Sequence, residues 1–289
     1  MLLKNPYFYA TLSILFWSTA ATAFKLTLKT VPFMFLLLCS SVISFLIFFS
    51  TQKGTFQIKG MLNSALMGFL NPFLYYLVLF KAYSLLSAQE AMALNYTWPL
   101  SLVLLSYPLL GQKPSSKTLL GMGVSFIGVL FIAKIWESPW KGRPTEFLGM
   151  ALAIGSSLIW ALYWILNVKD KRDDKIKMAQ NFFFGSLYSA LFVATFSNFY
   201  WPEIQGGLGI LYIGFFEMGF TFLFWLKALK FSDNTATVGR LIFIAPFFSL
   251  IWISVITGEV INLSSIIGLI LIVLGILGPE LFKRSGHGK

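Results

Sequence analysis

Long apolar runs occupy most of the chain, and short breaks with charged residues, glycine or proline separate them. An α-helix needs about 20 mostly apolar residues to cross a bilayer, and the breaks leave ten segments near that length. The segments lie near residues 6–25, 32–51, 60–80, 88–110, 117–134, 146–168, 178–198, 206–227, 235–257 and 263–282. Because the runs are continuous and do not alternate between apolar and polar residues, they predict helices rather than strands. The pattern therefore predicts an all-α integral membrane protein with ten transmembrane helices.

The composition agrees with this prediction and excludes several other classes of protein. Hydrophobic residues make up 57% of the chain and charged residues 11%, whereas a soluble domain carries about 25% charged residues. Cys39 and His287 are the only cysteine and histidine. An intramolecular disulfide, a Cys/His zinc site and a Ser-His or Cys-His catalytic pair inside the apolar body are therefore excluded. We expect no metal and no cofactor.

The distribution of basic residues predicts the orientation in the membrane. If the N-terminus is cytoplasmic, 15 of the 22 Lys and Arg residues lie in cytoplasmic segments and 6 in outer ones. The positive-inside rule then places both termini in the cytoplasm. The net charge is +11, and the basic residues are scattered over several short loops. We therefore expect these residues to contact anionic lipid of the cytoplasmic (inner) membrane, and we expect no nucleic-acid partner. Lys4 and the small residues 20–23 resemble a signal peptide, but nine segments follow, and we interpret 6–25 as an uncleaved helix.

The two halves of the chain resemble each other. Lys81-Ala82 recurs as Lys227-Ala228 at an offset of 146, and Pro99, Gly111, Gly121 and Gly128 recur as Pro246, Gly258, Gly268 and Gly275 at an offset of 147. The chain thus divides into a five-helix unit at 1–134, an outer linker at 135–145 and a second unit at 146–289. Because five is odd, the second unit must enter the membrane from the opposite face. Inverted repeats of this kind are typical of secondary transporters, whose substrate site lies near the midplane between the repeats.

Several motifs link the sequence to a known family. They are Phe16-Trp17-Ser18, Leu79-Phe80-Lys81-Ala82, Asn95-Tyr96-Thr97-Trp98-Pro99 and Gly111-Gln112-Lys113 in the first half, and Trp225-Leu226-Lys227-Ala228-Leu229, Pro246 and Gly258-Glu259 in the second. With these motifs the chain resembles the ten-helix EamA-type members of the drug/metabolite transporter superfamily over nearly its whole length. The Asn-Tyr-x-Trp-Pro and Gly-Gln-Lys elements also resemble the aromatic-amino-acid exporter branch. The family often has Gly-Glu where this chain has Gly111-Gln112.

The resemblance implies secondary transport, more often efflux than uptake. It also implies that the fifth and tenth helices are peripheral and support packing or a homodimer. Small residues in these helices allow close approach, and we expect them to form scaffold rather than a substrate site. They are Gly121, Gly123, Gly128, Gly268 and Gly275.

Three ionisable residues fall inside the predicted segments, where a charge costs about 3 kcal/mol or more at the helix centre. Glu217 is central in the eighth segment, Arg240 lies about two turns into the ninth, and Glu90 is near the outer end of the fourth. In one interpretation, Glu217 and Arg240 form an ion pair in or near a central cavity. In the other, the Arg240 side chain extends to the inner membrane interface, and Glu217 forms a hydrogen bond between helices. Glu217 and Glu90 are the candidates for a coupling proton. The repeat equivalent of Glu217 is Asn71, which favours a shared cavity over a simple polar contact between helices.

Prolines mark candidate hinges at Pro72, Pro99 and Pro246. Pro99 and Pro246 each remove a helix hydrogen bond and should kink the fourth and ninth segments. These kinks either bend as gates or are static.

Tryptophan and tyrosine residues are numerous within the segments. Belts of aromatic residues at the membrane interfaces explain those near the segment ends but not those inside the segments. Some of them line a cavity for an amphipathic solute, or they are core and lipid-facing residues. The candidate substrate-binding or coupling residues are Trp17, Asn71, Tyr76, Glu90, Asn95, Tyr96, Trp98, Trp160, Tyr163, Glu217, Thr221, Trp225 and Arg240.

These observations predict a secondary transporter that moves a small organic solute by alternating access, with efflux as the expected direction. The solute class is an amino acid or related metabolite, with aromatic ones as one option. No Walker A motif is present, so an ion gradient or the gradient of the solute must drive transport. A channel-like facilitator is the alternative. An integral-membrane enzyme is disfavoured, because the segments contain no histidine, no paired aspartates and no His-Glu-x-x-His motif.

Overall fold

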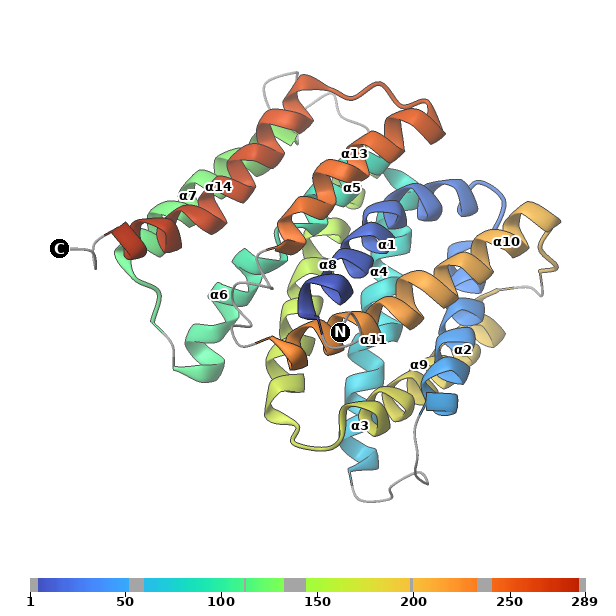
Figure 1. Ribbon diagram of the computed structural model, residues 1–289. Coiled ribbons are helices and arrows are strands. Elements are labelled where there is room, and N and C mark those ends of the chain that lie inside the picture. Colours follow the sequence, from blue (N-terminus) through green and yellow to red (C-terminus); the bar gives the residue numbers. More distant parts are fainter. Residues whose placement is uncertain are drawn as a thin grey trace.

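The computed structural model describes residues 5–51, 60–111, 113–132, 144–197, 200–232 and 241–285. Every regular element within these ranges is a helix (Figure 1). The first half contains α1 (Pro6–Thr27), α2 (Phe33–Thr51), the continuous run α3 (Met61–Gly68), η2 (Phe69–Leu74) and α4 (Tyr75–Leu85), then α5 (Ala88–Asn95), α6 (Trp98–Leu110) and α7 (Ser116–Ile132). These helices follow the first five predicted segments closely.

The second half of the chain is also helical. It contains α8 (Pro144–Lys169), α9 (Asp174–Phe196), the run α10 (Ile204–Tyr212), η3 (Ile213–Phe220) and α11 (Thr221–Phe231), the run η4 (Leu241–Ile244), α13 (Ala245–Trp252) and η5 (Ile253–Thr257), and α14 (Leu263–Ser285). The prediction of an all-helical chain built of apolar helices is confirmed.

Four of the described helical runs are long and apolar enough to cross a membrane, judged by length and composition. They are Phe33–Thr51, Met61–Leu85, Pro144–Asn167 and Ile204–Ala228. Shorter apolar helices occupy Leu119–Ile132, Leu241–Thr257 and Leu263–Gly278. Helix α1 lies in the middle of the molecule (Figure 1) and contacts helices of both halves, among them α4, α5, α11 and α13.

Local chemistry explains where several helices begin and end. The side chain of Asn5 accepts a hydrogen bond from the backbone N–H of Tyr7 at 2.9 Å and starts α1. The side chain of Asp173 does the same for α9, as expected for N-cap residues. Gly111 and Gly258 end α6 and η5 in the left-handed conformation, with φ of 69° and 73°. Glycine adopts this conformation without a steric penalty, so the repeated glycines have a helix-ending role.

The fourth and ninth segments are interrupted at their repeat-related prolines. Helix α5 ends at Asn95, and Pro99 lies in the first turn of α6. Pro246 lies in the first turn of α13, after the 3₁₀ turn η4. Proline lacks an N–H group and is therefore tolerated where a helix begins. The predicted interruptions are present, and their use as gates stays a prediction.

The third helical run of each half is irregular near its middle: η2 is a kink between two helices, and η3 is π-helical. Asn71 in η2 has non-helical backbone angles (φ −149°, ψ 122°) and precedes Pro72, which disfavours helical geometry for the residue before it. Glu217, the repeat equivalent of Asn71, lies in η3. Stretches of π-helix are frequent at functional sites.

Helices α7 and α14 pack side by side at one edge of the molecule (Figure 1). A Cβ atom added to Gly128 would lie 2.5 Å from the carbonyl oxygen of Gly268, and one added to Gly268 would lie 2.6 Å from that of Gly128. A Cβ atom on Gly275 would overlap the carbonyl oxygen of Gly121. The predicted scaffold role is confirmed for these four glycines. Gly123 has no neighbour within 4 Å of such an atom.

We therefore expect Gly275→Val to destabilise the protein by about 1–3 kcal/mol, because the added methyl groups overlap the α7 backbone. Gly123→Val is the matched control and should leave the melting temperature nearly unchanged. Thermal unfolding of the two purified variants measures the difference. Equal melting temperatures would show that α7 and α14 do not pack as described.

Candidate functional site

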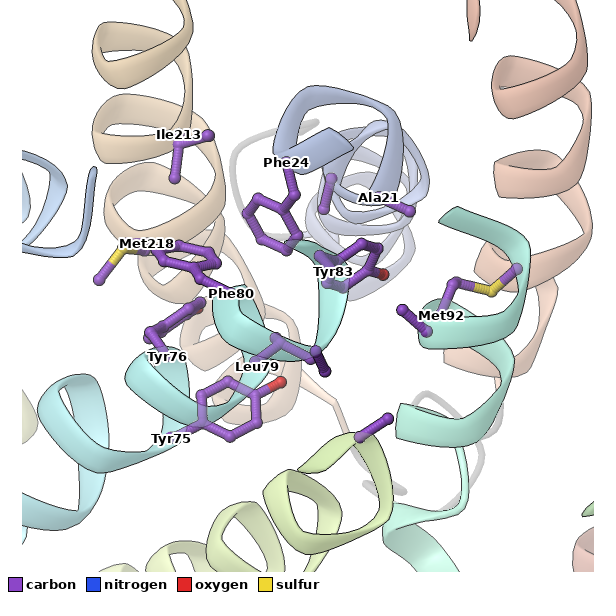
Figure 2. Packing of buried hydrophobic residues seen from close by; sticks show 14 of the residues in the cluster. Ala21, Phe24, Tyr75, Tyr76, Leu79, Phe80, Tyr83, Met92, Ile213 and Met218 are labelled. Carbon is purple, nitrogen blue, oxygen red and sulfur yellow. The ribbon is translucent and has the colours of Figure 1, made fainter. Parts of the chain in front are cut away.

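A cavity of about 430 Å³ lies between helices of both halves, within the size range of small-molecule sites. Its wall comes from α1, α4, α5, α6, α8, η3, α11 and η4. The lining residues are Trp17, Ala20, Ala21, Phe24, Tyr75, Leu79, Tyr83, Met92, Asn95, Tyr96, Trp98, Leu102, Ser106, Leu110, Trp160, Trp164, Ile165, Glu217, Trp225 and Ile242. Figure 2 shows part of this wall, where side chains of α1, α4 and α5 meet.

More than half of the candidate residues line this cavity. They are Trp17, Asn95, Tyr96, Trp98, Trp160, Glu217 and Trp225. Asn71, Tyr76, Glu90, Tyr163 and Thr221 are not among the lining residues. Arg240 lies outside the described residues, so the proposed pair of Glu217 and Arg240 stays a prediction.

The candidates outside the wall have other surroundings. Glu90 forms a capping box with Ser87 at the start of α5: its carboxylate accepts from the Ser87 hydroxyl at 2.7 Å, and its own N–H donates back at 3.3 Å. The Thr221 hydroxyl is buried and donates to the carbonyl oxygen of Phe216. Tyr76 does not line the cavity but contacts a residue that does, since its hydroxyl donates a hydrogen bond to Glu217 Oε1 at 3.3 Å.

Glu217 is the one carboxylate among the lining residues. Its side chain is buried, and Oε1 accepts the hydrogen bond from Tyr76. Oε2 has no hydrogen-bond partner in the part of the chain that the structure describes. A buried carboxylate in this setting needs a proton, a cation or a polar ligand to offset its desolvation. Glu217 is therefore placed to exchange a proton or to contact the polar group of a solute.

Nine of the residues that line the cavity are aromatic. The ring of Trp17 lies 5.5 Å from that of Trp225 and 6.1 Å from that of Phe222. The ring of Trp160, the repeat equivalent of Trp17, lies 5.8 Å from Phe222 and 4.6 Å from Tyr75. The buried Phe222 thus contacts both repeat-related tryptophans. Stacked and edge-to-face rings of this kind are rigid and favour apolar or aromatic ligands.

Asn95 supplies a polar patch where α5 ends. Its amide nitrogen donates to the Ser156 hydroxyl at 2.9 Å, and its oxygen accepts from the Tyr75 hydroxyl at 3.3 Å. These bonds join α5, α8 and α4 at the cavity wall.

Most of the residues that the sequence analysis missed share helical faces with ones it found. Residues 17, 20, 21 and 24 lie on one face of α1, and residues 98, 102, 106 and 110 lie on one face of α6. The lining residues 75, 79 and 83 share a face of α4 that includes no candidate. Side chains four residues apart in a helix lie one above the other, so Trp98 alone was a signal for the α6 face. Leu110 is the last residue of α6, and the cavity therefore extends to the end of the molecule where α6 ends.

Hydrogen bonds hold the opposite end of the cavity together. The Lys25 ammonium of α1 donates to the carbonyl oxygen of Tyr83 at 3.2 Å and to that of Leu86. These carbonyls lie at the end of α4, where a cation offsets the negative end of the helix dipole.

The start of α5 is tied to the segment that follows η5. Glu259 Oε1 accepts from the backbone N–H of Ala88 at 3.1 Å. The Gln89 amide donates to the carbonyl oxygen of Val260 at 3.0 Å and accepts from the N–H of Asn262 at 3.1 Å. We call these contacts the α5 latch. They join the two halves at the end of the cavity away from Leu110.

Comparison with known proteins decides the family. The model of the EamA-like transporter family matches residues 4–134 and again residues 147–278. The chain belongs to the EamA-like transporter family. Family membership and the apolar helices together make this chain a multi-pass membrane protein with the general role of a transporter, which implies a small solute as substrate and a lipid bilayer as surroundings.

Curated relatives of this EamA-like chain carry transporter names. An uncharacterized transporter of Clostridium kluyveri is 27% identical over 177 residues, which cover 59% of this chain and 56% of that protein. The match thus spans just over half of that relative's length. The aromatic amino acid exporter YddG of Ancylobacter novellus is 24% identical over 245 residues, covering 82% of this chain and 83% of that protein. The uncharacterized transporter YetK of Bacillus subtilis is 24% identical, covering 86% and 77%.

The fold of the EamA-like chain also matches a solved crystal structure. The TM-score is 0.68 at 21% sequence identity, over 96% of this chain and 98% of the other. At this identity the likeness concerns the fold.

Proposed function

We propose that this protein is a secondary transporter that moves a small organic solute across the cytoplasmic membrane by alternating access, in the direction of efflux. The solute class is an amino acid or related metabolite with an apolar or aromatic group. The cavity carries this proposal: it is lined by five tryptophans, one carboxylate and one amide. The name of the Ancylobacter novellus relative supports the same class of solute.

Two inverted repeats, residues 1–134 and 146–289 joined by an outer linker at 135–145, would provide the alternating access. The twofold match of the family model supports this division. The packing supports it as well, because contacts between the halves occur in equivalent pairs. Helix α1 packs on α11 and α13 as α8 packs on α4 and α6, and α2 packs on η3 as α9 packs on η2. The Gly121–Gly275 contact is likewise equivalent to the Gly268–Gly128 contact.

In the orientation predicted by the basic residues, both termini and the end of α6 are cytoplasmic. The cavity then extends to the cytoplasmic face, and the α5 latch closes its outer end. Release of the latch and closure around Leu110 would expose the same cavity to the outside. Glu217 is the group we propose to carry the coupling proton.

Counterflow in proteoliposomes tests this function. Protein-containing vesicles preloaded with unlabelled L-phenylalanine should transiently accumulate radiolabelled L-phenylalanine, and the initial rate should saturate with concentration. A carrier shows this behaviour because each conformational change moves one bound solute. Flux that rises linearly without counterflow would favour a channel-like facilitator and contradict the proposal. The same counterflow assay with a panel of other amino acids identifies the side chain that the protein prefers.

A further inference from the structure

Five residues that we call the ring pocket line the end of the solute cavity beside the α5 latch. They are Ala21 and Phe24 of α1, Leu79 and Tyr83 of α4 and Met92 of α5, and they lie where these three helices meet (Figure 2). The Lys25 ammonium donates to the backbone carbonyl oxygen of Tyr83 at 3.2 Å. This contact places the ring pocket at the end of the cavity away from Leu110.

The ring pocket has smaller side chains than the equivalent positions of the second half. At the repeat offsets of 143 and 146, Ala21 corresponds to Trp164 and Leu79 to Trp225. Both tryptophans line the cavity. A methyl group and an isobutyl group in the first half therefore take the positions of two indole rings in the second. This difference leaves space for a ring that belongs to the solute.

The ring pocket contains one hydroxyl group, which belongs to Tyr83. The residue is 3% exposed, and its hydroxyl has no hydrogen-bond partner in the part of the chain that the structure describes. In Figure 2 this hydroxyl points toward Met92, which also lines the cavity. Buried hydroxyls almost always pair with another polar group, and a phenol can both donate and accept. The Tyr83 hydroxyl is therefore placed to bind a polar group of the solute.

The other polar groups of the cavity lie near the start of α4. The hydroxyls of the adjacent residues Tyr75 and Tyr76 donate to Asn95 Oδ1 and Glu217 Oε1, each at 3.3 Å. Asn95 and Glu217 both line the cavity. Tyr83 is eight residues after Tyr75, which places it about 12 Å further along α4. An aromatic amino acid with a polar atom on the far edge of its ring matches this arrangement, with its head group at Asn95 and Glu217.

The wall between these two polar levels suits an aromatic ring. Leu79 lies one turn before Tyr83 on the same face of α4. The ring of Phe24 lies 5.2 Å from that of Tyr83 in an edge-to-face arrangement. The sulfur of a methionine such as Met92 makes favourable contacts with aromatic rings, and a further ring gains from aromatic neighbours. A charged side chain would find only the Tyr83 hydroxyl as a polar partner among the ring-pocket residues.

We propose that the ring pocket binds the side chain of the solute, and that the Tyr83 hydroxyl selects amino acids whose aromatic ring carries a hydroxyl or N–H group over those with an unsubstituted ring. The proposal rests on the proposed function and deepens it, because it names the part of the cavity that distinguishes one solute from another. It also orients the solute, with the ring toward the α5 latch.

Counterflow with L-tyrosine and L-phenylalanine tests the proposal, because these solutes differ only in the hydroxyl that Tyr83 would bind. In the unmodified protein, the KM for L-tyrosine should be about tenfold lower, since L-phenylalanine leaves the Tyr83 hydroxyl without a partner. Tyr83→Phe should raise the KM for L-tyrosine until the two values agree within about twofold. The KM for L-phenylalanine should change less than about twofold, because this solute has no hydrogen bond to lose.

Tyr107→Phe is the matched control for Tyr83→Phe. Tyr107 is 50% exposed and does not line the cavity, so this variant should keep the preference for L-tyrosine. Ala21→Leu is the second variant and should raise the KM for both solutes about tenfold or more, because its side chain fills the ring pocket. Ala23→Leu, on the same helix but outside the lining, is its control and should leave both values unchanged. Size-exclusion chromatography and melting temperature verify that each variant is folded.

The outcomes separate the ring pocket from the proposed function. Equal KM values for the two solutes in the unmodified protein, or a preference that persists in Tyr83→Phe, would overturn the ring pocket while counterflow itself still supports a carrier. KM values that Ala21→Leu leaves unchanged would overturn it as well. If neither amino acid shows counterflow, the proposed function fails, and the ring pocket fails with it.

Discussion

Glu217→Gln should abolish the pH dependence of solute transport and lower pH-driven flux about 100-fold, the scale on which loss of a proton-transfer group acts. The amide has nearly the shape of the carboxyl, keeps an oxygen that can accept from Tyr76, and cannot exchange a proton. The structure supports this expectation because Glu217 is the one carboxylate that lines the cavity and its Oε2 is unpartnered among the described residues. Flux of radiolabelled L-phenylalanine at several imposed pH gradients measures the effect.

Solute counterflow separates coupling from folding in this experiment. Exchange of one solute for another requires no net proton transfer, so Glu217→Gln should retain counterflow if it binds solute. Glu90→Gln is a matched control, because Glu90 caps α5 and does not line the cavity; its pH dependence should be that of the unmodified protein. If pH-driven flux is unchanged in Glu217→Gln, Glu217 does not carry the coupling proton.

Trp160→Ala should raise the KM for the solute about 30-fold, since loss of a central aromatic contact typically costs about 2 kcal/mol. Trp160 lines the cavity and contacts both Tyr75 and Phe222. Trp17→Ala should act similarly, because Trp17 is its repeat equivalent and contacts the same phenylalanine. Initial rates over a range of solute concentrations give KM and the maximal rate separately.

Trp201→Ala is the control for the loss of an indole ring. Trp201 is 81% exposed and does not line the cavity, so its substitution should leave KM unchanged. If Trp160→Ala and Trp17→Ala lower only the yield of folded protein and leave KM as it was, these rings act in packing and not in solute binding.

The sequence predicted the positions of the helices well, but it predicted poorly which face of each helix lines the cavity. Hydrophobic length and the breaks between runs located the segments, because the bilayer sets a minimum length for each. The face that lines the cavity was harder to predict, since lipid-facing and cavity-facing positions are both apolar. Tryptophans such as Trp98 and the carboxylate of Glu217 stood out, whereas Leu102 and Met92 resemble any other apolar residue of the chain.

Two polar residues show how local geometry limits prediction. Asn71 and Glu217 occupy equivalent positions in the third helices, but only Glu217 reaches the cavity. The backbone break at Asn71 is absent from η3, so the equivalent side chains have different surroundings. The capping role of Glu90 was not predicted, although Ser87 three residues before it gives the sequence pattern of a capping box.

The central claim is that one cavity is reached from each membrane face in turn, and the accessibility of a cavity residue tests it most directly. Ser106→Cys in a Cys39→Ser background places a single thiol on the wall between Trp98 and Leu110. Without solute, a membrane-impermeant maleimide should label this thiol from the cytoplasmic face only. Releasing the α5 latch with Gln89→Ala should allow labelling from the outer face and reduce labelling from the cytoplasmic one. Outer labelling that rises in Gln89→Ala with no loss of cytoplasmic labelling, or a thiol that is labelled from neither face in both proteins, would contradict alternating access.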